Sequence, residues 1–331
     1  MRVFVSGATG FIGKRLVKHL ANENITVHAL VRSVEKTLEF NHHNIQCFAG
    51  DICDAGTIEN AMRGCQYAFH LAAYARVWSK DKSIYRRVIY DGTINLLEAA
   101  LKCRIKKVVI VSTAGVFGPS EPDEPIDENT HRKVDYFSLY EKYKDRVDRY
   151  IIATYRDKIN FCIVCPTRVY GPGELSESNS VTKMIKMYHS GKFWFLPGDG
   201  SSIGNYVYVD DVLKGIMLAL HKGKRGERYI LGGENITYGE FFQRLSGISG
   251  IKHKQVKLPV PIIMFAAHIM QLGAILFRCS PLITPGWARK YLHNWYVSDE
   301  KARSALDYRP MSLKSGLKKT LVWLLSLEEN K

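Results

Sequence analysis

The chain has 331 residues, of which 46% are hydrophobic and 24% charged, so it can bury a full core and is not disordered. Its length predicts one large domain or two smaller ones, and ordinary Gly and Pro contents exclude collagen-like and low-complexity architectures. The seven cysteines are scattered without paired spacing, which favours a reducing, cytoplasmic location. Because strand-like residues begin at Arg2, we expect no leader peptide.

The net charge of +15 has two interpretations, a generally basic surface or a face for nucleic acid or an anionic membrane. The basic residues are spread along the chain. No cluster of them is uninterrupted or alternates with aromatic residues, as in grooves that bind single strands. We therefore expect a basic surface and no nucleic-acid partner.

The first 31 residues carry a dinucleotide-binding pattern. An apolar strand over 2–6 opens into the turn Gly7-Ala8-Thr9-Gly10-Phe11-Ile12-Gly13, followed by an amphipathic helix over 14–22 and a strand over 25–31. Glycines suit this turn because the chain must bend tightly, approach a pyrophosphate and pack the helix on the strand. The N–H groups at the start of the helix bind phosphate. The pattern predicts a nucleotide site.

Strands and helices continue to alternate, with strands expected over 45–49, 67–71, 107–111 and 160–165 and helices near 85–103 and 137–152. This alternation predicts an α/β fold, a Rossmann doubly wound parallel sheet with helices on both faces. Ligands bind beyond the carboxyl ends of such strands. We therefore expect one crevice to be lined by the residues at predicted strand ends: Gly7, Asp51, Ala72, Thr113 and Pro166.

We assign residues 1–165 to the dinucleotide-binding domain and residues 166–331 mainly to a smaller C-terminal substrate lobe. Segment 205–231 is expected to return to the first domain, with 206–211 as a strand of the main sheet. Cys162 and Cys165 fall in an apolar strand and are expected in the core. The pair Asp210-Asp211 is expected to cap the next helix, so we predict no metal site.

Tyr140 and Lys144 are four residues apart in a helical stretch and therefore share one face. The lysine charge can lower the pKa of the phenol, which could then exchange a proton with an alcohol or carbonyl oxygen. Isolated pairs of this kind are common on helix surfaces, but this one follows a nucleotide pattern and a strand that ends at Ser112-Thr113. Thr113 or Ser112 would hydrogen-bond the same substrate oxygen.

Several motifs together carry a family resemblance: 9–13, 51–52, 70–73, 92–100, 140–144, 166–173 and 208–212. On these motifs the chain resembles the extended short-chain dehydrogenase/reductase superfamily, the NAD(P)-dependent epimerase/dehydratase superfamily, along nearly its whole length. Segments 171–175, 226–235 and 308–324 are similar to its dihydroflavonol-reductase-like branch, which includes farnesol dehydrogenase.

The resemblance implies a role for each matching residue. Tyr140 would be the general acid/base, Lys144 its partner and ribose anchor, and Thr113 the donor to the substrate oxygen. The implied cofactor contacts are Gly7, Thr9, Gly10, Phe11, Ile12, Gly13, Asp51, Ile52, Ala72, Ala73, Tyr140, Lys144, Pro166 and Val169. Ile89 stands where the family often has Asn, which puts a structural water there in doubt. The resemblance also implies a homodimer.

Arg32 follows the second strand, where an acidic residue would bind the ribose hydroxyls of NAD. A guanidinium suits a 2′-phosphate instead, so NADP(H) is favoured as the cofactor. If Arg32 only stacks on adenine, NAD(H) stays open.

Residues 260–277 are nearly apolar, with interruptions at Pro261, His268 and Gln271. The length allows a transmembrane helix, but the interruptions favour a buried or interfacial one. Such a helix could line an apolar substrate pocket or rest peripherally on a membrane.

These features predict an NAD(P)-dependent oxidoreductase that interconverts an alcohol and a carbonyl by Tyr/Lys-assisted hydride transfer. Its substrate would be a small apolar molecule of isoprenoid, steroid or flavonoid-like type. The alternative is a nucleotide-sugar epimerase or dehydratase, although a dehydratase would need an acid beside Thr113, where Ala114-Gly115 stands. A cofactor-sensing binding protein is the third interpretation, and the Tyr–Lys pair argues against it.

Overall fold

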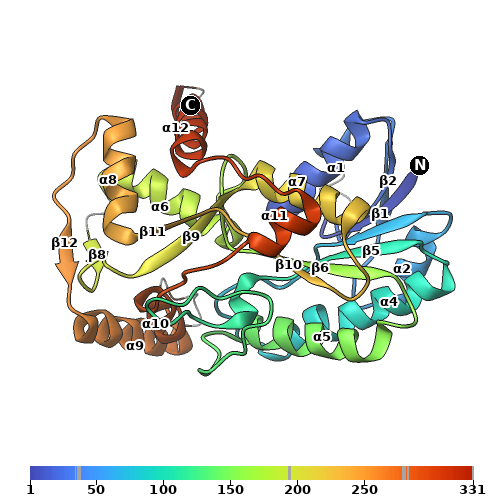
Figure 1. Cartoon of the computed structure of the whole chain (residues 1–331), viewed down its shortest axis with the longest axis horizontal. Coiled ribbons are helices and arrows are strands. Elements are labelled where there is room, and N and C mark those ends of the chain that lie inside the picture. The colour runs from blue at the N-terminus through green and yellow to red at the C-terminus, as the bar shows by residue number, and fades with distance from the viewer. Residues whose placement is uncertain (34, 36–38, 193–194, 278–280, 282, 330–331) are drawn as a thin grey trace.

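The computed structural model describes residues 1–33, 35, 39–192, 195–277, 281 and 283–329. Its main element is a parallel sheet in the order β10-β6-β5-β4-β1-β2-β3, which confirms the predicted doubly wound fold (Figure 1). The strands are β1 (Arg2–Ser6), β2 (Thr26–Val31), β3 (Ile45–Ala49), β4 (Tyr67–His70), β5 (Lys107–Val111), β6 (Phe161–Pro166) and β10 (Arg228–Leu231). The strand order reverses between β1 and β4, which places a ligand crevice at their carboxyl ends.

Helices cover both faces of this sheet, and each face has its own apolar core. One face carries α2 (Ala55–Met62), α4 (Gly92–Lys102) and α5 (Leu139–Tyr155); the other carries α1 (Phe11–Asn22), α7 (Val209–Lys222) and α11 (Glu300–Leu306). Cys162 and Cys165 of β6 are fully buried on opposite faces, as expected for core residues. Because side chains three apart on a strand point to opposite sides, the two thiols do not meet.

The helix expected over 85–103 is interrupted. It consists of α3 (Ser83–Tyr85), a π-helical turn η2 (Arg86–Asp91) and α4. Within η2, Ile89 is fully buried in the core, at the position where the family often has Asn. Its carbonyl accepts a hydrogen bond from Thr93 Oγ1 at 2.6 Å.

Two expectations about the second half are wrong. The strand predicted over 206–211 is β9 (Ile203–Tyr208), which pairs with β7 (Arg168–Tyr170) and β11 (Glu234–Thr237) in a separate sheet. Asp210 and Asp211 lie in the first turn of α7 and do not cap it. Asp210 binds Arg15, and Asp211 accepts a hydrogen bond from the Met311 backbone N–H at 2.9 Å.

The C-terminal lobe has a third core, formed around β7 and β9 by helices α6 (Ser180–His189), α8 (Tyr238–Ser249) and α12 (Leu313–Glu329). At the far end of the lobe, β8 (Phe195–Pro197) pairs with β12 (Val256–Leu258), followed by α9 (Val260–Leu276) and α10 (Pro285–Leu292) (Figure 1). The short 3-10 turns η3 (Ala114–Phe117) and η4 (Glu177–Asn179) precede α5 and α6 along the chain. Among the described residues, no helix has the length and apolar content needed to cross a membrane.

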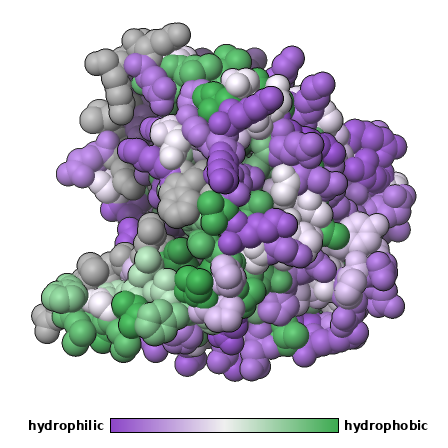
Figure 2. Space-filling view, turned by 90° about the vertical axis from the view of Figure 1, so that its left-hand side faces the viewer, coloured by the Kyte–Doolittle hydropathy of each residue, from purple (hydrophilic) through white to green (hydrophobic). Residues whose placement is uncertain are grey.

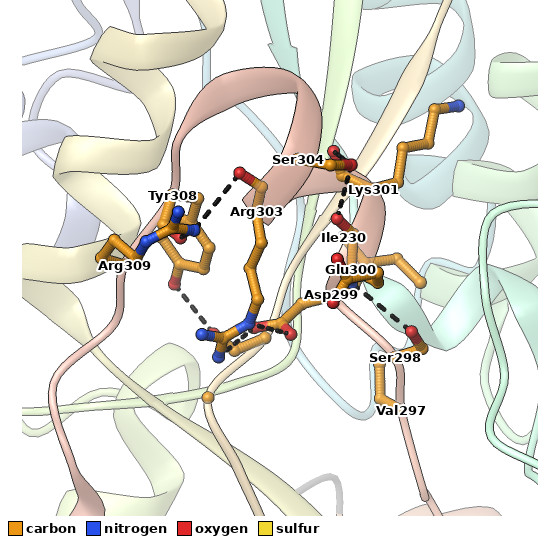
Figure 3. Close-up of polar contacts among 12 residues, drawn as sticks. Ile230, Val297, Ser298, Asp299, Glu300, Lys301, Arg303, Ser304, Tyr308 and Arg309 are labelled. Carbon is orange, nitrogen blue, oxygen red and sulfur yellow. Dashed lines mark hydrogen bonds and ion pairs between the residues drawn. The ribbon is translucent and has the colours of Figure 1, made fainter.

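The chain returns from the lobe to the main sheet through α11 (Figure 3). Arg303 binds both carboxylate oxygens of Asp299, at 2.7 and 3.1 Å, across the first turn. Beyond the helix, the Tyr308 hydroxyl is buried and donates to the carbonyl of Gly232 at 2.8 Å. This bond fastens α11 to the residue that follows β10.

We predict that Tyr308→Phe lowers the free energy of unfolding by about 1 kcal/mol or slightly more, since it leaves a buried carbonyl unpaired. Urea denaturation followed by circular dichroism measures this loss. Tyr150→Phe, which removes an exposed tyrosine hydroxyl, is the matched control. Equal stability of the two variants would show that the Tyr308 bond does not hold α11.

Candidate active site

The glycine-rich turn between β1 and α1, residues 7–13, exposes backbone that few side chains cover; we call this turn the nucleotide cradle. Gly7 has a φ of +69°, and a Cβ there would lie 2.6 Å from the backbone nitrogen of Ala72. A Cβ on Gly13 would lie 2.0 Å from the carbonyl oxygen of Gly7. Gly10 N–H donates to that same oxygen at 3.0 Å, and Gly10 begins α1 without a side-chain cap. The N–H groups at the start of α1 are therefore available to a phosphate, so the cradle fits a dinucleotide.

A cleft of about 430 Å³ opens at the carboxyl ends of the strands. All the residues for which we predicted a catalytic or cofactor role line it: Gly7, Thr9, Gly10, Phe11, Ile12, Gly13, Arg32, Asp51, Ile52, Ala72, Ala73, Thr113, Tyr140, Lys144, Pro166 and Val169. Arg32 is exposed, directly after β2, and Asp51 follows β3. The expectation that the residues at strand ends line one crevice is confirmed.

Helix α5 brings Tyr140 and Lys144 into this cleft, starting from Ser138, whose hydroxyl accepts the Glu141 N–H at 3.2 Å. Lys144 is buried, and its Nζ donates to the carbonyl of Val111 at the end of β5 at 2.7 Å. Burial lowers the pKa of Lys144, while the charge of Asp148 raises it.

The pKa of Tyr140 moves opposite to our prediction. Burial raises the pKa of the Tyr140 phenol, and the charges of Asp148 and Glu141 raise it further. The Lys144 amino group is held by the carbonyl of Val111, and the charge of Asp148 on the same helix faces it. In the free protein Tyr140 is therefore a phenol that keeps its proton at neutral pH.

Asp148 completes the polar face of α5 and was missed from the sequence. It is fully buried, accepts a short hydrogen bond from the Ser112 hydroxyl, and faces the charge of Lys144. Burial raises the pKa of Asp148 to about 6, although Lys144 and Ser112 oppose the shift. The signal was available, because Asp148 lies one helical turn after Lys144.

This contact also decides between the two candidate hydroxyls. The Ser112 hydroxyl donates its hydrogen bond to the Asp148 carboxylate. Thr113 Oγ1 accepts the Gly115 N–H at 3.2 Å, which leaves its hydroxyl hydrogen available to a ligand in the cleft. Thr113 is therefore the hydroxyl placed to donate to a substrate oxygen.

A buried histidine lies behind the cradle. His70 Nδ1 is 2.7 Å from Ser6 Oγ, and His70 Nε2 is 2.9 Å from Thr93 Oγ1. Since Thr93 donates its hydrogen to Ile89, it accepts from Nε2–H, and Ser6 donates to Nδ1. Burial and the charge of Lys144 lower the pKa of His70 well below its usual value, so the ring is neutral. The chain of bonds joins β1, β4 and η2 beneath the cleft.

The residue after Tyr140 holds a buried ion pair that sequence reasoning also missed. The Glu141 carboxylate is 3.2 Å from Arg132 and 2.7 Å from Nζ of Lys290, which belongs to α10 of the lobe. Arg132 is itself buried and donates to the carbonyl of Gly115 at 2.7 Å. No local sequence pattern links these three residues, because Arg132 lies in the loop before α5 and Lys290 comes from a distant part of the chain.

Arg168, at the start of β7, lines the cleft with its guanidinium enclosed by aromatic rings. Tyr206, Tyr238 and Tyr291 each have a ring centroid 4.8–5.6 Å from the guanidinium carbon. Within the described ranges, no carboxylate lies within 4 Å of Arg168, and its Nη2 is buried without a hydrogen-bond partner. The cleft therefore contains a positive charge that the protein does not neutralise.

No group of three or more potential metal ligands is placed to hold an ion in the part of the chain that the structure describes. Fold and cleft define a Rossmann-type dinucleotide-binding protein with a Tyr–Lys pair beside the nucleotide cradle. The model of the NAD dependent epimerase/dehydratase family matches residues 3–232, and the chain belongs to this family.

Known proteins agree with this assignment. A putative dihydroflavonol 4-reductase of Synechocystis sp. is 27% identical over 97% of this chain and 93% of its own length. A 4-hydroxy-2-methyl-3-oxo-4-farnesyl-3,4-dihydroquinoline-1-oxide ketoreductase of Stigmatella aurantiaca is 28% identical over 93% of this chain and 92% of its own. The resemblance to the extended short-chain dehydrogenase/reductases and their dihydroflavonol-reductase-like branch is confirmed.

Among solved structures, UDP-glucose 4-epimerase of Thermotoga maritima, determined with UDP-glucose, has a TM-score of 0.81. It is 24% identical and covers 99% of this chain and 100% of its own. This likeness shows the fold.

We predict that Asp148 makes the protein less stable as the pH rises from about 4 to about 6. Its pKa in the folded protein, about 6, lies above that of an unfolded Asp. Over this interval the folded state therefore binds more protons than the unfolded state, and the free energy of unfolding falls with rising pH.

Thermal denaturation of wild type and Asp148→Asn across this interval measures the effect. The variant does not titrate at this position, so its melting temperature falls less between pH 4 and pH 6 than that of wild type. Parallel curves for the two proteins would contradict the raised pKa.

Proposed function

We propose that the protein is an NAD(P)-dependent oxidoreductase that interconverts an alcohol and a carbonyl on a small, largely apolar substrate. The observation that carries the proposal is the convergence of Tyr140, Thr113 and Lys144 on one cleft with the nucleotide cradle. Phe137, Trp287 and other aromatic side chains line the same cleft and favour an apolar substrate. A relative named as a ketoreductase of a farnesyl-bearing quinoline supports the same substrate class.

The residues divide the work as follows. Thr113 donates a hydrogen bond to the substrate oxygen, and Tyr140 exchanges a proton with it. A bound nicotinamide would supply or accept the hydride. In carbonyl reduction the protonated phenol of Tyr140 gives its proton to the substrate oxygen, and in alcohol oxidation both steps reverse. Lys144, fixed by Val111, lies one helical turn after Tyr140 and would anchor the ribose of the cofactor, as the family resemblance implies.

We propose NADP(H) as the cofactor. Arg32 lines the cleft directly after β2 and is exposed, so its guanidinium is free to meet a 2′-phosphate. The family name specifies dependence on NAD, and the preference for the phosphorylated form rests on Arg32 alone. We also propose that the chain forms a homodimer, as the family resemblance implies, and sedimentation velocity measures this directly.

One observation favours a nucleotide-sugar epimerase as the second candidate. The unneutralised guanidinium of Arg168 in the cleft could bind a diphosphate. Against it, the lobe contributes aromatic residues to the cleft, among them Trp287 and Tyr291, and its other cation there, Lys290, is paired with Glu141. Chromatography of UDP-sugars incubated with the protein distinguishes this candidate, because an epimerase shows no net change in cofactor.

We predict that Tyr140→Phe lowers turnover by about 10²- to 10⁴-fold, because the proton exchanged with the substrate oxygen loses its carrier. The assay follows reduced nicotinamide by absorbance, with a panel of isoprenoid, steroid and aromatic ketones and alcohols. Tyr143→Phe removes a hydroxyl from the same helix outside the cleft lining and serves as control. Turnover that survives in Tyr140→Phe would remove the tyrosine from the mechanism.

We predict that Arg32→Asp weakens NADPH binding by about tenfold or more and leaves NADH binding unchanged or tighter, since a carboxylate repels the 2′-phosphate. Isothermal titration with both cofactors measures the change. Arg225→Asp makes the same charge change at an exposed site outside the cleft lining. If wild type bound NADH tenfold tighter than NADPH, the assignment of NADP(H) would be wrong.

A further inference from the structure

Helix α9 exposes a continuous apolar surface at one end of the lobe. Of its residues, Ala267 and Ala274 alone are buried. The large side chains with 53–80% exposure are Ile262, Phe265, Ile269, Leu272, Ile275, Leu276 and the following Phe277. Figure 2 shows hydrophobic side chains gathered along the lower part of this face, where α9 lies. An exposed apolar patch of this kind marks an interaction site.

This exposure corrects two of the interpretations given from the sequence. The segment 260–277 is not a buried helix, because most of its large side chains face solvent. It does not line the cleft either, since no residue of α9 contributes to the cleft lining. The interfacial interpretation is the one compatible with the structure.

The chain around α9 is basic and carries no acidic residue. Residues 241–298 contain seven Lys and Arg and no Asp or Glu. Lys252, Lys254 and Lys257 are exposed on the segment that leads through β12 into α9. Arg289 is exposed on α10, which packs against α9. Along the sequence the apolar helix is thus flanked by positive charges only, and among the described residues the one acidic residue seen to interact with the flanking lysines is Asp199, which faces Lys257.

This combination of charge and hydrophobicity selects the partner. A second copy of this chain placed symmetrically on α9 would bring the same positive charges together with no acidic residue of 241–298 to offset them. An anionic lipid surface offers an apolar interior for the helix and negative headgroups for the lysines. We propose that α9 docks in the plane of an anionic membrane surface, with Lys252, Lys254 and Lys257 on the headgroups.

Docking would also place the membrane near one end of the cleft. Helix α10 packs on α9 and contributes Trp287, Lys290 and Tyr291 to the cleft lining. An apolar molecule dissolved in the bilayer would therefore enter the cleft from the docked side. The docking itself does not depend on the reaction proposed above, so each can fail without the other.

The test is flotation of the full chain with vesicles of phosphatidylcholine alone and of phosphatidylcholine mixed with phosphatidylserine. Wild type floats with the mixed vesicles. The double variant Phe265→Gln/Leu272→Gln binds them at least about tenfold more weakly, because two exposed apolar side chains no longer enter the lipid. Val322→Gln/Leu325→Gln makes the same kind of change on exposed residues of α12 and floats like wild type. Melting temperatures show that all variants are folded.

A second variant tests the charge. Lys252→Glu/Lys254→Glu/Lys257→Glu weakens binding to the mixed vesicles by about fivefold or more for each lysine, and added salt reduces the difference. Wild type that stays unbound to both kinds of vesicle would overturn the proposal, as would an α9 double variant that floats like wild type. A wild-type dimer that binds no lipid and dissociates in the α9 double variant would identify the helix as a subunit interface instead.

Discussion

The close contact between the β1–α1 turn and the end of β4 is the constraint on which the rest of the cleft depends. Gly7 lies against the backbone of Leu71 and Ala72, and Gly13 lies against Gly7. Side chains at either glycine would push α1 away from the sheet, and with it the N–H groups at the start of the helix. The hydrogen bond between Ser6 and His70 joins the same two strands one residue earlier. The cradle is therefore positioned by backbone packing and by a buried neutral histidine together.

The opposite wall of the cleft is held by buried polar interactions instead of close backbone packing. There the end of β5 and the face of α5 are joined by buried polar groups, with Lys144 on the carbonyl of Val111 and Ser112 on Asp148. Burying these groups costs solvation, which each recovers only through its partner. In return the network fixes which hydroxyl faces the cleft and how Tyr140 is presented. The buried polar network therefore orients the side chains of the cleft and adds little to the stability of the fold.

How far the sequence predicts this molecule depends on the range of the interactions. The glycine turn, the alternating elements and the Tyr140–Lys144 spacing are local, so fold and cleft lining were predictable residue by residue. The sheet to which β9 belongs was not predictable, because the sequence of an apolar strand does not show which strand it pairs with. The same holds for the Arg132, Glu141 and Lys290 contact and for the tyrosines around Arg168, which unite distant segments. The expected pKa of Tyr140 failed because burial, invisible in sequence, outweighs a neighbouring charge.

The ion pair between Lys290 and Glu141 has a mechanical consequence. The pair connects α10 to α5, because the buried carboxylate of Glu141 binds both Lys290 of α10 and Arg132 of the loop before α5. If α10 moved outward by a few ångströms, Glu141 would lose Lys290 and keep Arg132, and the attraction between Glu141 and Lys290 would oppose the movement. The two sides of the cleft are thus joined by a charge contact one residue from Tyr140. A force on the end of the lobe where α9 and α10 pack together, if it moved α10 outward, would therefore act against the attraction between Lys290 and Glu141.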